Sequence, residues 1–368
     1  MGEVLSRRAL NRATLDRQML LRRARLDAGQ AVEHLVGLQT QIPQTHYTAL
    51  WSRLEDFDPD DFSDRFERRE FVRLALLRGT IHTVTARDAL ALQPLFKVLL
   101  ARVLKSASGK ALANVDLESA AERARVLVEK EPLTFSEIGK ALLADWPDSQ
   151  PQALGMLARH LLAMVQVPPR GLWQRGGLSR HTTLQHWLGE EPAADATPDD
   201  MVLRYFGAFG PASVRDVQAW SGLTRLSEVV ERHRGELVVF RDENGVELFD
   251  LPDAPRPDQD VPAPARFLPE LDNLFISHKD RSRIVSDQAA QAVWLLNVSY
   301  PVFLSDGFIQ GSWKLTVDEK RAHASLAIRP FGALPADQRE ALEREGAELL
   351  GFHAAGAGHE IHWGRHGD

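Results

Sequence analysis

Residues 198–251 read PDDMVLRYFGAFGPASVRDVQAWSGLTRLSEVVERHRGELVVFRDENGVELFDL, and this stretch decides the fold. Three short segments with helical patterns, at about 198–208, 213–221 and 225–234, come before two runs with alternating apolar residues. The runs meet at Asn244-Gly245, a pair typical of a tight hairpin turn. Three short helices followed by a β-hairpin are the order of a winged helix, which is usually a DNA-binding module and sometimes only a scaffold for protein interactions.

A motif at the start of the middle helix occurs twice in the chain. Gly210–Val217 and Glu131–Ile138 share Pro-x-(Ser/Thr)-x-x-(Asp/Glu)-(Ile/Val). Each copy contains a capping box, which marks a helix start: Ser213 with Asp216, and Thr134 with Glu137. Around the earlier copy we predict helices at about 116–129, 134–145 and 151–164, a strand at Val165–Val167 and a wing-like loop at 168–177. The chain therefore has two winged helices in tandem as its predicted centre.

The N-terminal part is expected to form a third, degenerate winged unit. Asp27 and Gln30 make a capping box for a helix that runs towards Pro43, and HYTALWSRL continues as a second helix. FVRLALLRGTIHTVTARDAL is interpreted as a helix, a short strand around Ile81–Val84 and another helix.

After a Pro-rich linker at about 252–264, the C-terminal part is expected to be mainly β. We predict antiparallel strands joined at Asp306-Gly307 and at Gln310-Gly311, and a late helix at about 335–350.

Composition limits the possible chemistry. The chain has 368 residues, a net charge of −7 and no cysteine, which excludes disulfides, thiolate zinc sites and a cysteine nucleophile. No apolar run is long enough to span a membrane and no leader is evident, so we expect a cytoplasmic protein without a membrane partner. Negative charge disfavours a nucleic-acid partner, but the basic residues are segregated, with seven arginines within residues 3–25 and an acid-free island at 165–181. This segregation suits a protein with one face that binds a polyanion.

Gln39-Thr40-Gln41, in HLVGLQTQIPQTHY, brings two uncharged amides close together before Pro43. Side chains two positions apart diverge on a helix but share a face on extended backbone. A converging pair could hold one water or one sugar. The alternative is that both amides merely satisfy backbone groups where the helix breaks.

Several stretches taken together resemble a known family. These are LVGLQTQ, LRGTIHTVTARDA, PPRGLWQRGG, YFGAFGPASVRDVQAWSGL, LPELDNLFISHKDRSRI and DGFIQGSW. In order and over nearly the whole chain they resemble the winged-helix DNA glycosylases, a superfamily that includes AlkZ and YcaQ. The resemblance implies three tandem winged helices and a C-terminal β module around a concave DNA channel. It also implies that Gln39 and Gln41 occupy the positions of a catalytic Gln-aliphatic-Gln motif, with Thr40 in place of the aliphatic residue.

The activity implied by the resemblance is removal of N7-alkylguanine from DNA, including release of interstrand crosslinks left by alkylating natural products. Hydrolysis of an N-glycosidic bond passes through an oxocarbenium-like sugar. N7-alkylguanine is already cationic and leaves without a general acid, so the protein need only orient a water and place dipoles. Two glutamines suit such an activated substrate. Catalysis by Gln39 and Gln41 is therefore our hypothesis for a monofunctional DNA glycosylase that acts in DNA repair or self-resistance.

Other residues are candidates for DNA contact. His82 would project from its strand towards the Gln pair and could touch a phosphate or the abasic sugar, although a lone histidine is more often a core residue. A hairpin around Val302–Leu315 could enter a DNA groove without flipping a crosslinked base. The further DNA-binding candidates are Arg78, Arg175, Lys279, Arg281, Arg283, Trp313 and Lys314. Trp313 could equally be a core residue, and Arg78 could equally form a surface salt bridge.

We expect neither metal nor cofactor. The tail HEIHWGRH places His359, His362 and His366 at spacings of three and four, but it is not the metalloprotease motif and is expected to be frayed.

The predicted fold class is α+β, mainly α, with modules at 1–112, 113–190, 191–260 and 261–368. Two functions from different classes remain: a monomeric glycosylase that acts on double-stranded DNA with alkylated guanine, and a non-enzymatic winged-helix DNA-binding protein or transcriptional regulator. A regulator would normally dimerise on a palindrome.

Overall fold

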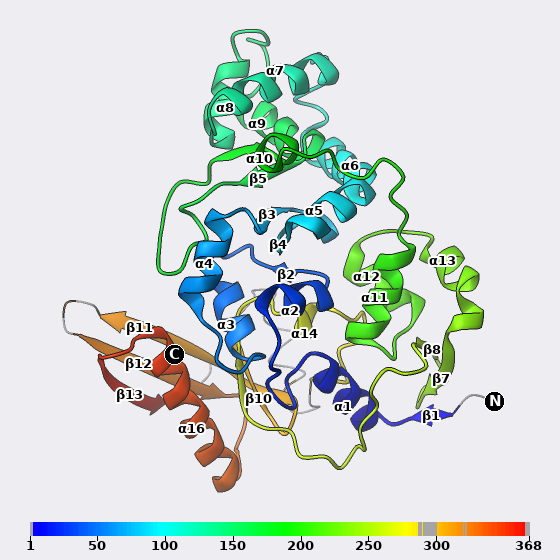
Figure 1. Ribbon diagram of the computed structural model, residues 1–368, viewed down its shortest axis with the longest axis vertical. Coiled ribbons are helices and arrows are strands. Elements are labelled where there is room, and N and C mark those ends of the chain that lie inside the picture. The colour runs from blue at the N-terminus through cyan, green and yellow to red at the C-terminus, as the bar shows by residue number, and fades with distance from the viewer. Residues whose placement is uncertain (1–2, 286–288, 290–299, 319, 321, 365–368) are drawn as a thin grey trace.

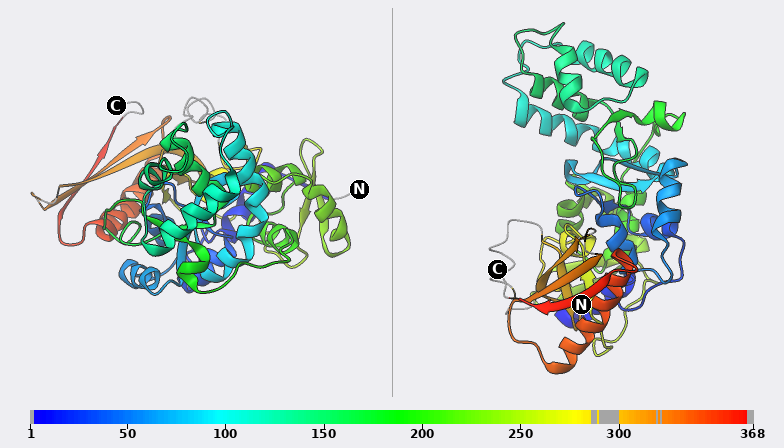
Figure 2. Two further views of the ribbon diagram at one scale, coloured as in Figure 1. Left: turned by 90° about the horizontal axis from the view of Figure 1, so that it is seen from above. Right: turned by 90° about the vertical axis from the view of Figure 1, so that its left-hand side faces the viewer.

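The fold is α+β, and a computed structural model describes residues 3–285, 289, 300–318, 320 and 322–364 (Figure 1). Within these residues the strands form three sheets, of five, three and five strands. The helical lobe of α7, α8 and α9 lies at one end of the molecule and the C-terminal sheet lies towards the other (Figures 1 and 2). No helix in the described part of the chain is long and apolar enough to cross a membrane.

The central sheet joins segments that are far apart in sequence. Its strand order is β2-β4-β3-β5-β6, with neighbours antiparallel. The strands are β2 (Leu38–Gln39), β4 (Ile81–Thr85), β3 (Phe71–Ala75), β5 (Met164–Gln166) and β6 (His181–Thr183). The first and second predicted modules therefore share one sheet, and Gln39 lies on its edge strand opposite His82.

The helix before the Gln pair ends earlier than expected. α2 (Ala28–His34) begins with the predicted capping box, but the chain turns at Val36 (φ 53°) and Gly37 (φ 91°) rather than at Pro43. A Cβ at Gly37 would come within 2.6 Å of Val84, so this turn packs directly against β4. Gln39 consequently lies on a strand, and the second helix, α3 (Thr45–Trp51), follows as predicted.

The segment Phe71–Ala75 is a strand, and the prediction of a helix there is wrong. All five of its residues are buried, because β3 is paired with β4 on one side and β5 on the other. The strand at residues 81–85 and the following helix are confirmed. The remaining elements of this part are α4 (Pro59–Glu67), η1 (Leu77–Gly79), α5 (Ala86–Leu92), η2 (Gln93–Phe96) and α6 (Lys97–Ser108).

The lobe after α6 has the predicted order of helices. Its helices are α7 (Leu117–Lys130), α8 (Phe135–Leu142) and α9 (Pro151–Leu161), and β5 follows directly. The capping box of Thr134 and Glu137 is present at the start of α8. A separate apolar core of alanine, leucine and valine side chains holds these helices together. After β6, the short helix α10 (Leu184–Leu188) leads out of this lobe.

The three helices and the hairpin predicted within residues 198–251 are also found. Its elements are α11 (Asp199–Phe209), α12 (Val214–Ser221), α13 (Leu226–Arg232), η3 (Arg234–Glu236), β7 (Val238–Asp242) and β8 (Glu247–Asp250). Ser213 and Asp216 form the expected capping box, and the hairpin turns at Asn244-Gly245. The N-terminus belongs here: β1 (Val4–Leu5) pairs with β7, and Arg17 of α1 (Arg7–Arg17) forms a buried ion pair with Asp250 at 2.6 Å.

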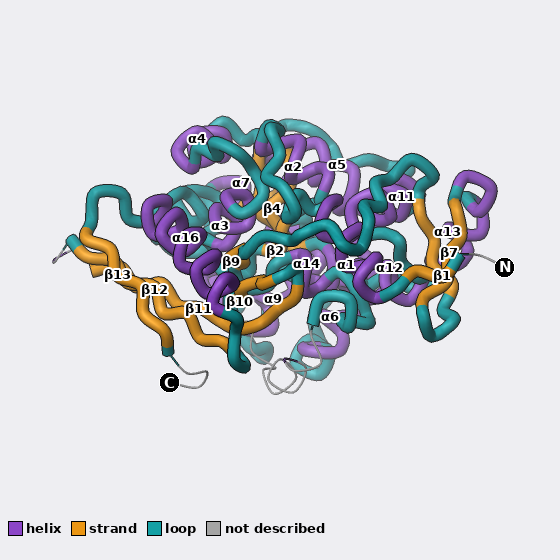
Figure 3. The backbone as a smooth tube through the Cα atoms, turned by 90° about the horizontal axis from the view of Figure 1, so that it is seen from below, coloured by secondary structure: helices purple, strands orange, loops and turns teal. Residues whose placement is uncertain are grey.

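The C-terminal part is mainly β with one long helix, as predicted. Its sheet has the order β13-β12-β11-β10-β9 and lies beside α16 (Figure 3). The elements are β9 (Arg266–Leu268), α14 (Asn273–Ile276), β10 (Val302–Ser305), β11 (Phe308–Asp318), β12 (His323–Pro330), α16 (Ala336–His353) and β13 (Gly358–Trp363).

Two expectations for this part are wrong. Gln310-Gly311 is not a turn but lies inside β11, where a Cβ on Gly311 would come within 2.3 Å of the Phe303 ring. The tail is not frayed up to Trp363, because β13 pairs in parallel with β12. The turn at Asp306-Gly307 is confirmed.

Candidate functional site

Gln39, Thr40 and Gln41 lie at the edge of the central sheet. The Thr40 amide donates to the Ile81 carbonyl at 2.8 Å, so the pairing of β2 with β4 extends past Gln39. Thr40 is buried, Gln39 is 8% exposed and Gln41 is exposed. Successive side chains along an extended backbone point to opposite faces. The side chain of Thr40 therefore points to one face, and those of Gln39 and Gln41 point to the other.

The hydrogen bonds of the two amides define their orientation. Gln39 Oε1 accepts from Arg78 Nη2 at 2.5 Å, and Gln41 Oε1 accepts from the Ile81 amide at 3.2 Å. Both partners can only donate, so the oxygen of each amide must face them. The alternative role of satisfying a backbone group thus holds for one oxygen, that of Gln41. Each oxygen has a second lone pair that can accept another hydrogen bond.

Arg78 lies in the tight turn η1 between β3 and β4. Its backbone is left-handed (φ 55°), and its Nη1 donates to the Trp220 carbonyl of α12. A Cβ on Gly222 (φ 79°) would come within 3.1 Å of Arg78 Cα, so only glycine allows this close approach. Burial, together with the nearby Arg281, lowers the pKa of Arg78 to about 10. Arg78 therefore ties the end of α12 to the Gln39 amide.

His82 is next to Gln39 in the sheet register but is only 2% exposed. Its Nδ1 donates to the Thr80 carbonyl at 3.0 Å, because a carbonyl can only accept. Burial and the charge of Arg78 lower the pKa of His82 to about 3. The ring is therefore neutral near pH 7, with Nε2 as an acceptor.

A buried polar chain that was not predicted lies behind Thr40. Arg73 Nη2 donates to the Thr40 carbonyl at 2.6 Å, and the Thr40 and Thr83 hydroxyls are 3.1 Å apart. His46 lies 2.9 Å from the Thr83 hydroxyl through Nδ1 and 3.0 Å from the Gly171 carbonyl through Nε2.

The carbonyl of Gly171 requires a proton on His46 Nε2, so Nδ1 accepts from Thr83, and Thr83 in turn accepts from Thr40. Burial lowers the pKa of His46, which keeps this neutral tautomer. Thr40 thus has a defined role that an aliphatic residue in its place could not fill.

The predicted cations after α14 differ in their placement. Arg281 stacks over Phe275 at 4.3 Å and is close enough to lower the pKa of Arg78, whereas the side chain of Lys279 is exposed. Arg283 must be corrected: it is buried and donates to the Thr14 hydroxyl at 3.2 Å and the Pro211 carbonyl at 2.9 Å. Its guanidinium binds the protein interior.

One residue predicted on the C-terminal hairpin is also corrected. Trp313 is a core residue, 8% exposed, and its indole donates to the Leu268 and Val302 carbonyls. The turn of the β10–β11 hairpin packs against α1, where Asp306 pairs with Arg8 at 2.7 Å and Arg12 at 2.5 Å. This hairpin tip is therefore not free to enter a groove.

Two other predicted cations, Lys314 and Arg175, are exposed. Arg175 lies 3.5 Å from Glu67.

Within the described residues no group of three His, Asp or Glu side chains could hold an ion. His359 and His362 lie on β13, where an odd spacing directs them to opposite faces, and His366 lies outside the described residues.

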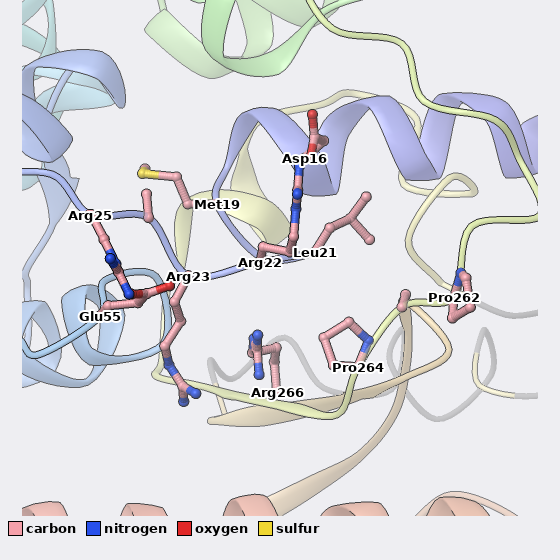
Figure 4. Close-up of a pocket in the computed structure, with 12 residues that line it drawn as sticks. Asp16, Met19, Leu21, Arg22, Arg23, Arg25, Glu55, Pro262, Pro264 and Arg266 are labelled. Carbon is pink, nitrogen blue, oxygen red and sulfur yellow. The ribbon is translucent and has the colours of Figure 1, made fainter.

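A cavity of about 870 Å³ lies away from the Gln pair, between the segment after α1 and the linker before β9 (Figure 4). Arginines line it, but three are paired: Arg23 and Arg266 with Glu345, and Arg25 with Glu55. Neither glutamine lines this cavity or two smaller ones of about 360 and 510 Å³. Of the two residues, Gln41 is exposed, whereas Gln39 is largely buried.

Stability should depend on pH through buried histidines. Burial lowers the pKa of His82 and His181 to about 3 and of His353 to about 4, below the value of 6.5 for an unfolded chain. Below pH 6.5 the unfolded chain binds more protons, so stability should fall as the pH drops towards 4, by up to about 1.4 kcal/mol per pH unit for each histidine. Above pH 6.5 these groups contribute no slope.

Thermal melts followed by circular dichroism between pH 7.5 and 5.0 test this expectation. His353→Gln should reduce the slope, because this variant lacks one of the buried imidazoles whose pKa is lowered. A melting temperature that stays constant down to pH 5.0 would contradict it.

Comparison with known proteins adds two findings. Residues 32–352 match the family described as DNA glycosylase AlkZ-like. The fold is similar to the solved structure of Streptomyces sahachiroi DNA glycosylase AlkZ, with a TM-score of 0.77 and 19% sequence identity over 98% of this chain and 100% of that one. No curated protein matches the chain. At this identity the structural likeness establishes the fold alone.

Proposed function

The chain belongs to the AlkZ-like family of DNA glycosylases, which hydrolyse N-glycosyl bonds in DNA, and from this premise we propose that it is a monofunctional enzyme releasing N7-alkylguanine. The observation that carries the proposal is the pair of oriented amides, Gln39 and Gln41, on an edge strand that is held by Arg78 through Gln39 and by Arg73 through Thr40.

The chemistry of the pair suits a base that is already prepared to leave. N7-alkylguanine carries a positive charge, so the bond to the sugar breaks without a general acid, and the remaining needs are a placed water and fixed dipoles. The free lone pair of either Oε1 can accept from that water, and the NH2 groups can donate to a neighbouring phosphate. An unmodified base would leave poorly from such a site.

A monofunctional reaction follows from the groups at hand. A covalent Schiff base with the sugar needs a lysine amine. The cations that contact the Gln39-Thr40-Gln41 strand are the guanidinium groups of Arg78 and Arg73, which stay protonated. Water is therefore the proposed nucleophile.

Bulky adducts and interstrand crosslinks are part of the proposed substrate range. A crosslinked base cannot be flipped into a deep pocket, because the adduct ties it to the other strand. The exposed position of Gln41, outside the three cavities, fits a lesion that is approached at the surface.

We interpret the two helix-and-hairpin units as winged helices and the N-terminal part as a third, degenerate one, around a DNA channel. Their unequal order along one chain supports a monomer that follows the duplex rather than a dimer on a palindrome.

Base release from a defined duplex tests the proposal. The enzyme is incubated with DNA carrying a single N7-methylguanine or a natural-product crosslink, and the freed base is measured by mass spectrometry. We expect release that leaves an unbroken abasic strand, and no covalent product with borohydride. Sequence-selective binding without release above background would instead indicate a regulator.

A further inference from the structure

Helix α6 carries a stretch with an unusual charge. Residues 89–115 contain Lys97, Arg102, Lys105 and Lys110 but no aspartate or glutamate, although the whole chain has a net charge of −7. The first three lie on α6, the cyan helix between α5 and the α7–α9 lobe in Figure 1, and all three are exposed.

Several surface arginines of this protein are paired with carboxylates, and the α6 cations differ from these arginines. Arg25 pairs with Glu55 at 2.5 Å, Arg232 with Asp199 at 2.9 Å and Arg234 with Glu247 at 2.9 Å. In the part of the chain that the structure describes, no ion pair or side-chain hydrogen bond involves the three α6 cations. Their charge is left for a ligand outside the chain.

The other side of α6 packs against the turn that carries Arg78. Leu100 and Val103 lie against Gly79, and Leu99 lies against Gly222, at the end of α12. Arg78 lies between these two glycines and bonds to Gln39. The basic face of α6 is therefore one helix diameter or less from the turn that positions the candidate catalytic amide, roughly 10 Å.

The spacing along the helix fits a nucleic-acid strand. Lys97 to Lys105 spans eight residues, or about 12 Å at 1.5 Å per residue. Successive phosphates of one strand are about 3.4 Å apart along the duplex axis, so this length covers about three to four of them. Between the cations the face carries Val98 and small Ala101, which leave the backbone of a ligand room to approach.

We propose that the face formed by Lys97, Arg102 and Lys105 binds the phosphate backbone of duplex DNA beside the Gln pair. The inference rests on the proposed approach of duplex DNA to Gln39 and Gln41. This binding does not depend on the base sequence of the DNA, because phosphate contacts hold the duplex in register while the amides act on the lesion.

The test is the salt dependence of binding to a fluorescent, lesion-free duplex. The variant Lys97→Gln/Arg102→Gln/Lys105→Gln should bind about 10- to 100-fold more weakly near 0.1 M salt, and the slope of log K against log salt should decrease by about 2 to 3. Half-maximal release of N7-methylguanine should likewise require a correspondingly higher enzyme concentration than for the parent chain.

A matched control removes the same charge elsewhere. Arg22→Gln/Arg25→Gln/Arg344→Gln changes three exposed arginines on the segment after α1 and on α16. Its salt slope should fall by less than 1. Equal slopes for the two triple variants would overturn the proposal and direct attention to an acidic protein as the partner of α6.

Protection from chemical modification needs no variant. Duplex DNA should shield Lys97 and Lys105 from acetic anhydride, with exposed Lys140 of α8 as the reference. Equal acetylation with and without DNA would also overturn the proposal. Because both binding tests use lesion-free DNA, failure of this surface is distinguishable from failure of the parent chain to release a base.

Discussion

Replacement of either Gln39 or Gln41 by alanine should slow release of N7-methylguanine by about 10²- to 10³-fold, the usual effect of removing one preorganised polar group that acts on a transition state. Affinity for lesion-free duplex should change little, since neither amide carries charge. Single-turnover release at saturating enzyme and fluorescence anisotropy measure the two quantities separately.

Glutamate variants separate the two ends of each amide. Gln39→Glu keeps an oxygen that faces Arg78 but replaces the NH2 donor by a second acceptor. If the lone pair that orients water is what matters, this variant should keep most of its release rate. If the NH2 matters, through a phosphate, the rate should fall as far as in Gln39→Ala.

Gln44→Ala is the matched control. Gln44 lies three residues further on, and its amide binds the Leu172 carbonyl and the Gln174 amide rather than the site. Release should be unchanged. Full activity of Gln39→Ala and Gln41→Ala would instead mean that the pair is structural.

Local patterns predicted much of the fold. The capping boxes of Asp27, Thr134 and Ser213 are all present, because each depends only on residues three positions apart. The hairpin at Asn244-Gly245 follows for the same reason.

Features that depend on distant partners escaped prediction. FVRLA has apolar residues on both faces, and periodicity alone cannot distinguish a buried strand from a buried helix. Pairing with β5, about ninety residues later, settles it as β3. The helix α2 was expected to run to Pro43, but it ends at His34. The close approach of Gly37 to Val84 of β4 places the change of direction earlier in the chain.

The sequence predicted that some of the candidate residues lie near one another, and it did not predict the residues that support them. The two glutamines, His82 and Arg78 do lie together, in contact or in register. The support of Thr40 by Arg73, Thr83 and His46 joins three separate segments, which no spacing in the sequence reveals. An arginine inside the apolar run FVRLALL was the one available signal, since a buried cation needs a reason.

Replacement of Arg78 should slow base release nearly as much as loss of Gln39, because Arg78 holds the Gln39 amide in position. Its guanidinium bridges the Trp220 carbonyl and Gln39 Oε1. Its backbone is left-handed, and burial lowers its pKa to about 10. The fold therefore sustains a strained, partly buried cation at this position. Arg78→Met should leave the Gln39 amide free to rotate, and a displacement of about 1 Å can cost about 10²-fold in rate.

Two further variants separate position from charge and from backbone strain. Arg78→Lys keeps the charge but lacks the planar fork that reaches both acceptors, so it should remain slow. Arg78→Gly relieves the left-handed backbone and should raise the melting temperature relative to Arg78→Met, yet be equally inactive.

Separate measurements of the release rate and of DNA affinity distinguish a positioning role of Arg78 from a direct phosphate contact. A positioning role predicts a lower single-turnover rate at saturating enzyme, with little change in the salt slope of binding. A direct phosphate contact, the role expected from the sequence, predicts a slope lower by about 0.9 and a rate that recovers at saturation. An Arg78→Lys enzyme with full rate would rule out positioning, because the single ammonium cannot hold α12 and Gln39 together.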